Sequence, residues 1–182
     1  MKIAITYATT EGQTRRICRF CADKLVDDGH AVELLAAADG DDLNLGRFDA
    51  AILAASVHVG AYQAGMRAFV EYHAAALAGR RTLFLSVSLA AAGDDPDELA
   101  ELDAIADRFF RDTGWRPDRV AQVAGAFRFT QYDFFRSWAM RWIASRKGEE
   151  VDPHADKEYT DWDALHAVLH DWSAGSDGEA PG

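Results

Sequence analysis

The chain has 182 residues, of which 49% are hydrophobic and 27% are charged. This composition is typical of a globular protein, and the length fits one domain at roughly 100–200 residues per domain, so global disorder is excluded. The formal net charge of −11 argues against nucleic-acid binding, which needs a phosphate-neutralising surface, and no apolar run approaches the ~20 residues that span a bilayer.

Strands and helices are predicted to alternate along the chain. Apolar runs rich in β-branched residues indicate strands, and apolar residues spaced three and four apart indicate helices. The expected strands are 2–8, 31–35, 49–57, 81–88 and 118–125, and the expected helices are 14–28, 64–78, 94–112 and a last helix that starts at Thr160. Thr160 is the predicted N-cap of that last helix. The N-terminus lacks the longer apolar run of a secretory signal, so we expect a cytoplasmic protein.

The two cysteines, Cys18 and Cys21, form a C-x-x-C pair within a predicted helix. Residues three apart share one face of a helix, so this pair is interpreted as two small thiols facing the core. A thioredoxin-like redox pair would open a helix after a strand, and a structural zinc site would need a second pair of ligands. No metal is expected.

Five apolar strands alternating with helices predict a parallel α/β sheet covered on both faces. In such sheets ligands bind beyond the carboxyl ends of the strands. The loops 8–13, 56–62 and 88–95, and the chain after residue 125, are therefore the candidate binding loops.

The first candidate loop lies between the first strand and the first helix. Its residues are Thr9, Thr10, Glu11, Gly12, Gln13 and Thr14. Hydroxyls and backbone N–H groups at a helix N-terminus bind anions, and the loop has neither the P-loop lysine nor the dinucleotide fingerprint. It therefore predicts a site for a single phosphate, with an ordinary polar loop as the alternative. The loop resembles the FMN phosphate loop of flavodoxin-like proteins, [ST]-x-T-G-x-T, from which Glu11 departs.

Two further loops are expected to hold the flavin ring that this resemblance implies. Their residues are Ser56, Val57, His58, Val59, Gly60 and Tyr62 after the third strand, and Ser88, Leu89 and Ala90 after the fourth. Gly60 can adopt either peptide orientation, so its carbonyl is expected to accept from a reduced flavin N–H. Tyr62 is expected to pack near the ring. His58 is either an acid–base group or a solvent-facing loop residue.

The segment 126–148, after the fifth strand, combines aromatic and basic residues. It holds five basic residues and the single acid Asp133, a local charge of +4 in an acidic chain. Aromatic rings and cations together suit a membrane–water interface with anionic headgroups, and a core helix with solvated arginines is the alternative. The residues expected at the membrane or substrate are Phe129, Tyr132, Phe134, Phe135, Trp138 and Trp142.

Several motifs in the same order resemble the flavodoxin-like, quinone-dependent protoporphyrinogen oxidases. They are the acidic phosphate loop 10–14, Trp115–Arg119, Gly125–Phe129 and Tyr159–Trp162, with 126–148 at the position of that family's long insertion. The resemblance implies a flavodoxin-like sheet of strand order 2-1-3-4-5 over residues 1–173. It also implies FMN as cofactor, and a place on the inner face of the cell membrane. The small, polar composition of residues 174–182 predicts a disordered tail.

The implied reaction is oxidation of protoporphyrinogen IX to protoporphyrin IX, with electrons passing through FMN to menaquinone or ubiquinone. Arginine binds carboxylates by paired hydrogen bonds, so Arg128, Arg136 and Arg116 are the expected partners of the substrate's propionates. Two other functions remain open. One is a flavodoxin that only carries electrons, and the other is an FMN-dependent NAD(P)H:quinone reductase.

Overall fold

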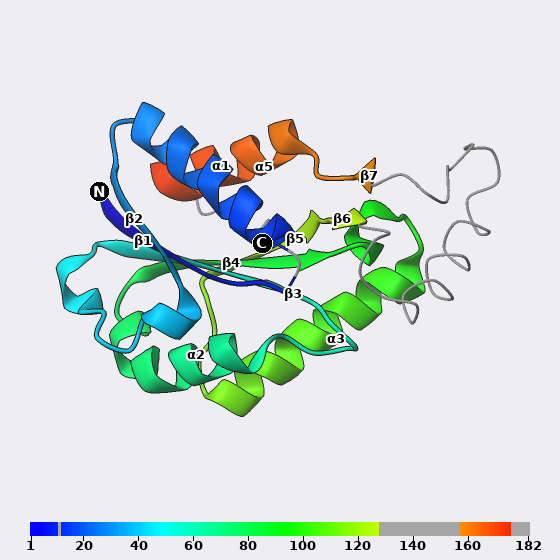
Figure 1. Ribbon diagram of the computed structural model, residues 1–182, viewed down its shortest axis with the longest axis horizontal. Coiled ribbons are helices and arrows are strands. Elements are labelled where there is room, and N and C mark those ends of the chain that lie inside the picture. The colour runs from blue at the N-terminus through cyan, green and yellow to red at the C-terminus, as the bar shows by residue number, and fades with distance from the viewer. Residues whose placement is uncertain (11, 128–156, 176–182) are drawn as a thin grey trace, which may run out of the picture.

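A computed structural model describes residues 1–10, 12–127 and 157–175. Its centre is a parallel sheet of five strands in the order β2-β1-β3-β4-β5 (Figure 1). The strands are β1 (Lys2–Ala8), β2 (Ala31–Ala36), β3 (Ala50–Ser56), β4 (Arg81–Ser88) and β5 (Arg119–Ala124). The predicted α/β class, strand order and flavodoxin-like architecture are confirmed.

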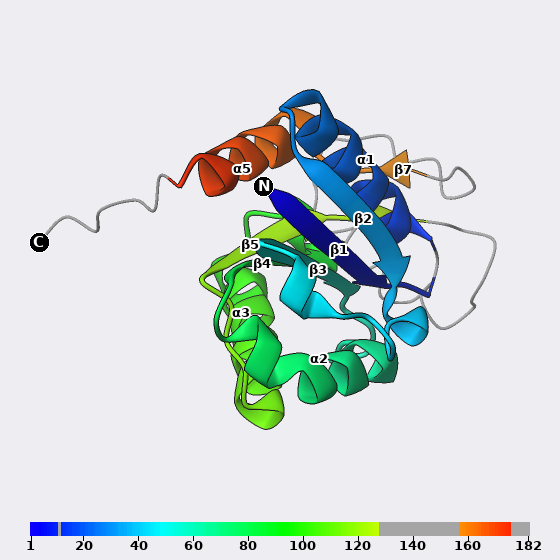
Figure 2. The same cartoon turned by 90° about the vertical axis from the view of Figure 1, so that its left-hand side faces the viewer.

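Helices cover both faces of the sheet. Helices α1 (Gln13–Asp27) and α5 (Trp162–Ala174) lie on one face, and α2 (Ala64–Leu77) and α3 (Pro96–Thr113) lie on the other (Figure 2). Short 3-10 turns are η1 (Ala37–Asp39), η2 (Leu45–Arg47) and η3 (Ala90–Ala92). Two clusters of buried apolar residues, one on each face, pack the sheet against its helices, as a doubly covered parallel sheet requires. Among the described residues, no helix has the length and apolarity needed to cross a membrane.

Capping residues explain where the helices start. The Asp95 carboxylate accepts from the backbone N–H groups of Asp97 and Glu98 at the start of α3. The predicted N-cap of the last helix is wrong by one residue, because the Asp161 carboxylate accepts from the Ala164 N–H at 2.9 Å. The Thr160 hydroxyl instead donates to the Ala124 carbonyl at 2.7 Å.

The C-terminal boundary also differs from the prediction. Helix α5 runs to Ala174 and ends at Gly175, whose φ is 76°, so the domain extends past residue 173. Residues 176–182, which make up most of the predicted tail, lie outside the described residues.

A small antiparallel pair brings distant parts of the chain together beside the main sheet. Strand β6 (Ala126–Phe127) pairs with β7 (Lys157–Glu158), and the Tyr159 N–H donates to the Gly125 carbonyl at 3.0 Å. Most of the predicted insertion, residues 128–148, lies outside the described residues. The pair therefore fixes where the chain leaves the sheet and where it returns.

The cysteine pair lies in the core, as predicted. Cys18 and Cys21 on α1 are both fully buried. Burial raises the pKa of both thiols, that of Cys21 to about 12. Both therefore remain protonated packing groups at neutral pH.

Candidate functional site

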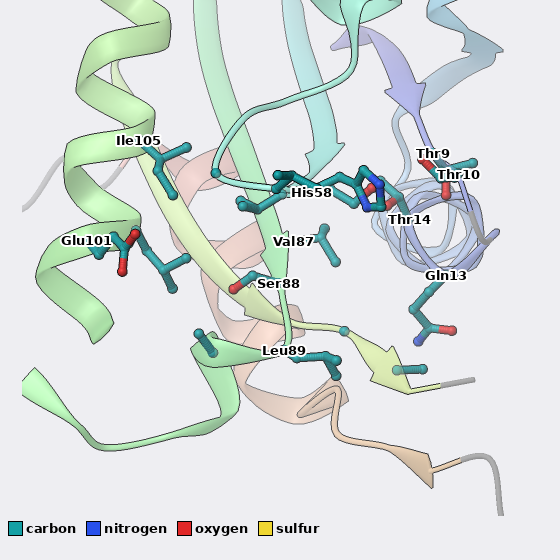
Figure 3. A pocket seen from close by; sticks show the side chains of 18 of the residues that line it. Thr9, Thr10, Gln13, Thr14, His58, Val87, Ser88, Leu89, Glu101 and Ile105 are labelled. Carbon is teal, nitrogen blue, oxygen red and sulfur yellow. The ribbon is translucent and has the colours of Figure 1, made fainter. Parts of the chain in front are cut away.

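A pocket of about 360 Å³ opens at the carboxyl ends of β1, β3 and β4. Figure 3 shows Thr9, Thr10, Gln13 and Thr14 on one side of it and Glu101 and Ile105 of α3 on the other. The volume is in the range of small-ligand sites. The lining residues are Thr9, Thr10, Gln13, Thr14, Ser56, Val57, His58, Val59, Gly60, Val87, Ser88, Leu89, Ala90, Glu98, Glu101, Leu102, Ile105, Gly125 and Ala126.

The first loop is a candidate anion cradle at the N-terminus of α1. The Gly12 N–H donates to the Thr9 hydroxyl at 2.9 Å, and Gly12 adopts the left-handed φ of 88° that favours glycine. The Thr14 hydroxyl is buried at the pocket and has no hydrogen-bond partner among the described residues. An orphaned buried hydroxyl beside free helix N–H groups fits a bound phosphate. Glu11, also predicted in this loop, lies outside the described residues.

Gln63, which sequence reasoning missed, links the first two loops. Its amide Nε2 donates to the Ser56 hydroxyl at 2.5 Å and to the Thr10 hydroxyl at 3.3 Å. Its Oε1 is buried without a partner among the described residues. Gln63 immediately precedes α2, and polar residues there are common, so its sequence position alone carries no signal for this role.

Residues 58–61 of the second loop form a tight turn. Backbone N–H groups and carbonyls of His58 and Ala61 bond to each other at 2.8 and 3.1 Å. The two central residues, Val59 and Gly60, have φ of 49° and 70°, as a type I′ turn requires. A positive φ is strained for a β-branched residue such as Val59. The Val59 side chain is 76% exposed beside the pocket.

The Gly60 carbonyl has a partner from another element. Arg108 of α3 donates to it from Nη2 at 2.6 Å. Arg108 therefore competes for this carbonyl with the expected donor, the N–H of a reduced flavin. The two residues are 48 positions apart in the chain. The contact depends on how α3 packs, so no local pattern reveals it.

Tyr62 is placed in the core and does not line the pocket, which corrects the expectation that it packs near a ligand. Its hydroxyl donates to the Ser86 hydroxyl at 2.8 Å, and its ring packs edge-on to Phe84 and Phe109. Burial raises its pKa to about 12. As a type I′ turn reverses the chain just before it, Tyr62 returns toward the sheet.

The third loop lies where predicted. Ser88, Leu89 and Ala90 line the pocket, and the Ser88 hydroxyl accepts from the Ala91 N–H at 3.1 Å. The Ser88 carbonyl accepts from the Gly125 N–H at 2.9 Å. This bond connects the loop after β4 to the chain after β5.

One wall of the pocket comes from α3, which sequence reasoning missed. Its pocket-lining residues are Glu98, Glu101, Leu102 and Ile105. They lie at i, i+3, i+4 and i+7, so one face of the helix presents two carboxylates and two apolar side chains. The signal was available, because this helix follows a candidate loop at the carboxyl edge.

Arg116 is not at the pocket, contrary to its expected role as a propionate partner. It precedes β5 and so lies at the amino edge of the sheet, whereas the pocket lies at the carboxyl edge. There it forms an ion pair with Asp107 and lies over the Phe110 ring. The other predicted substrate and membrane residues lie outside the described residues: Arg128, Phe129, Tyr132, Phe134, Phe135, Arg136, Trp138 and Trp142.

Comparison with protein families supports the same interpretation of this fold. The flavodoxin domain model matches residues 4–154. The chain belongs to this family. Membership implies a flavin cofactor, and the pocket lies at the carboxyl edge of the sheet, lined by all three candidate loops.

Curated relatives cover nearly the whole chain. The chain is 29% identical over 165 residues to a protoporphyrinogen IX dehydrogenase [quinone] of Escherichia coli (strain K12), covering 91% of each protein. It is 28% identical over 174 residues to a protein of the same name from Leishmania major, covering 95% of this chain and 75% of that protein. The resemblance expected from the sequence motifs is confirmed.

Solved structures share the fold. A flavodoxin of Streptococcus pneumonia TIGR4 matches with a TM-score of 0.57 at 22% identity, over 96% of this chain and 99% of that one. At this identity the match establishes architecture only.

Proposed function

We propose that this protein is an FMN-dependent oxidoreductase that converts protoporphyrinogen IX to protoporphyrin IX and passes the electrons to a quinone. The observation that carries the proposal is the similarity to dehydrogenases of that name over 91% of the chain, supported by a pocket of small-ligand size at the carboxyl edge of the sheet. The reaction belongs to haem biosynthesis, and menaquinone or ubiquinone is the proposed acceptor.

The first loop is proposed to hold the phosphate of FMN. Thr9, Thr10 and Thr14 offer hydroxyls, and the first turn of α1 offers backbone N–H groups with the positive end of its dipole. Since Glu11 is acidic, its backbone N–H, and not its side chain, is the expected contact. The cradle has one anion site, which favours FMN over a dinucleotide flavin.

The second and third loops are proposed to enclose the ring system. Val57, Leu89 and Ile105 supply apolar surface that excludes water, and the backbone of Ser88–Ala90 supplies polar groups. The bound flavin would supply a two-electron acceptor at its reactive nitrogen. The chain itself then binds, orients and shields the reacting groups, and no side-chain acid or base is assigned. His58 is exposed at the pocket and is kept as a binding residue only.

Membrane attachment through residues 126–148 is proposed from charge. The segment has a local charge of +4, whereas the whole chain carries −11, so anionic lipid would attract this segment and repel the rest. A peripheral position would bring the pocket to the membrane quinone. Replacing both Trp138 and Trp142 by Ala is expected to weaken vesicle binding and leave FMN binding unchanged.

Membership of the flavodoxin family over residues 4–154 supports a second candidate, an electron carrier with no substrate of its own. Anaerobic mixing of the FMN-loaded protein with protoporphyrinogen IX and a quinone separates the two functions. The dehydrogenase forms fluorescent porphyrin, and the carrier forms none above the protein-free rate. Rapid reduction of the flavin by NAD(P)H, followed by its reoxidation by a soluble quinone, would instead indicate the NAD(P)H:quinone reductase.

A further inference from the structure

The 58–61 turn presents an apolar side chain to solvent at the edge of the pocket. Val59 is 76% exposed and has a φ of 49°, a conformation that is costly for a β-branched residue. Backbone strain of this kind is found at sites where a side chain must be presented in a fixed direction. Val59 therefore offers a fixed apolar contact next to the cavity.

A guanidinium lies beside this apolar contact. Arg108 donates one N–H to the Gly60 carbonyl at 2.6 Å, and its side chain is exposed. Within the part of the chain that the structure describes, no carboxylate forms an ion pair with it, whereas Arg67 and Arg116 each have an acidic partner. Arginine has five N–H donors, so Arg108 keeps donors for a ligand.

Along α3 the charge changes from acidic at the pocket wall, at Glu101, to basic beside the 58–61 turn, where Arg108 contacts Gly60. Glu101, Ile105 and Arg108 are spaced at i, i+4 and i+7 and so lie on one face, with Glu101 and Arg108 about 10 Å apart along the axis. A carboxylate on a ligand would be repelled at the Glu101 end and attracted at the Arg108 end. This arrangement of charges favours one orientation of an acidic apolar ligand that reaches from the pocket to the 58–61 turn.

We propose that Arg108 binds a propionate of the tetrapyrrole substrate and that Val59 contacts the apolar macrocycle beside it. This inference rests on the proposed function, and it assigns to Arg108 the role that Arg116 is too distant to fill. The contact is a charge-assisted hydrogen bond from the guanidinium to a carboxylate. Its bond to the Gly60 carbonyl fixes the guanidinium in place before the ligand arrives.

The test compares a ligand that carries two free propionates with a ligand in which both are esterified and uncharged. Protoporphyrin IX and its dimethyl ester are titrated into the FMN-loaded protein, with binding followed by porphyrin fluorescence. Arg108→Gln is expected to weaken binding of the diacid about tenfold and to leave binding of the ester unchanged. Arg108→Lys keeps the charge and is expected to recover part of the loss. Arg111→Gln removes the same charge one turn further along α3 and is expected to behave as wild type.

Each outcome has one interpretation. If Arg108→Gln weakens both ligands equally, the residue only supports the 58–61 turn and the inference is wrong; it is equally wrong if neither ligand is affected. If the wild-type protein binds neither ligand and forms no porphyrin, the proposed function itself has failed. If the wild-type protein forms porphyrin, and Arg108→Gln distinguishes the diacid from the ester as well as wild type does, the proposed role of Arg108 is wrong and the proposed function stands.

Discussion

The side-chain amide of Gln13 donates to the carboxylate of Glu158 at 2.6 Å, joining the first residue of α1 to a residue 145 positions later in β7. The same amide donates to Thr160 at 3.1 Å, and Arg16 donates to Glu158 at 2.8 Å. Gln13 also lines the pocket. The N-terminal end of α1, at the pocket, is thus bonded directly to the point where the chain returns to the sheet.

Removing this carboxylate should loosen the return point. In Glu158→Ala, Gln13 and Arg16 lose their acceptor, which costs about 1 kcal/mol for a partly buried bond. The backbone N–H of Tyr159, bonded to the Gly125 carbonyl, should then exchange its hydrogen several times faster. Hydrogen–deuterium exchange with peptide resolution measures this.

The matched control is Glu33→Ala, which removes the exposed carboxylate of β2 that pairs with Arg47. Its exchange around Tyr159 should equal that of wild type. Unchanged exchange in Glu158→Ala would show that the backbone pairing of β6 with β7 holds the return point without this side chain.

Gly12→Ala should destabilise the phosphate cradle through backbone strain alone. An added Cβ meets nothing within 4 Å at Gly12, but its φ of 88° is costly for alanine, so the free energy of unfolding should fall by about 1 kcal/mol. FMN binding, measured by fluorescence titration, should weaken as well. Gly65→Ala is the control, because Gly65 lies in α2 with open space and no positive φ. It should raise stability by about 0.5–1 kcal/mol; a rise for Gly12→Ala too would refute the strain argument.

Tyr62→Phe tests whether Tyr62 is a core residue. The substitution removes the bond to the buried Ser86 hydroxyl and should lower the free energy of unfolding by about 1 kcal/mol, with the FMN dissociation constant unchanged. Tyr72→Phe, at a position that is 73% exposed, should change neither quantity. Weaker FMN binding in Tyr62→Phe, with the free energy of unfolding unchanged, would show that Tyr62 is a binding residue and not only a core residue.

The two thiols should be unreactive in the folded protein. Burial raises the pKa of Cys21 to about 12 and that of Cys18 well above its ordinary value of 9.0. A raised pKa favours the protonated form on folding, so this contribution to stability is complete below pH 9.0 and is lost as the pH rises toward 12. An aromatic disulfide reagent at pH 8 should label neither cysteine until the protein is unfolded by denaturant, and rapid labelling of the native protein would contradict their burial.

The sheet could be predicted because its signals are local. The apolar run 81–88 gave β4 its observed limits, Arg81–Ser88, and Asp95 with Pro96 gave the start of α3 to within two residues. Thr160 and Asp161 are both good N-cap residues, and the local pattern does not distinguish them. Asp161 is the N-cap because the Thr160 hydroxyl donates to the Ala124 carbonyl instead.

The site could be predicted only in part. Its loops follow strands that the local sequence reveals, whereas its side walls depend on how distant elements pack together. Thr9, Thr14 and Ser88 line the pocket as their positions after strands predict. The contact of Arg108 with Gly60 depends on the packing of α3 against the 58–61 turn, which no spacing in the sequence encodes. Arg116 was misassigned on residue type alone, since its place before β5 already puts it at the opposite edge of the sheet.

The measurement that tests the account most directly is the anaerobic ratio of quinol to porphyrin formed by the FMN-loaded protein from protoporphyrinogen IX. Removing six electrons through a two-electron acceptor should yield about three quinols per porphyrin, with both products absent when FMN is omitted. Porphyrin formed at the same rate without the protein, or with no quinol produced, would contradict the proposed dehydrogenase and favour an electron carrier.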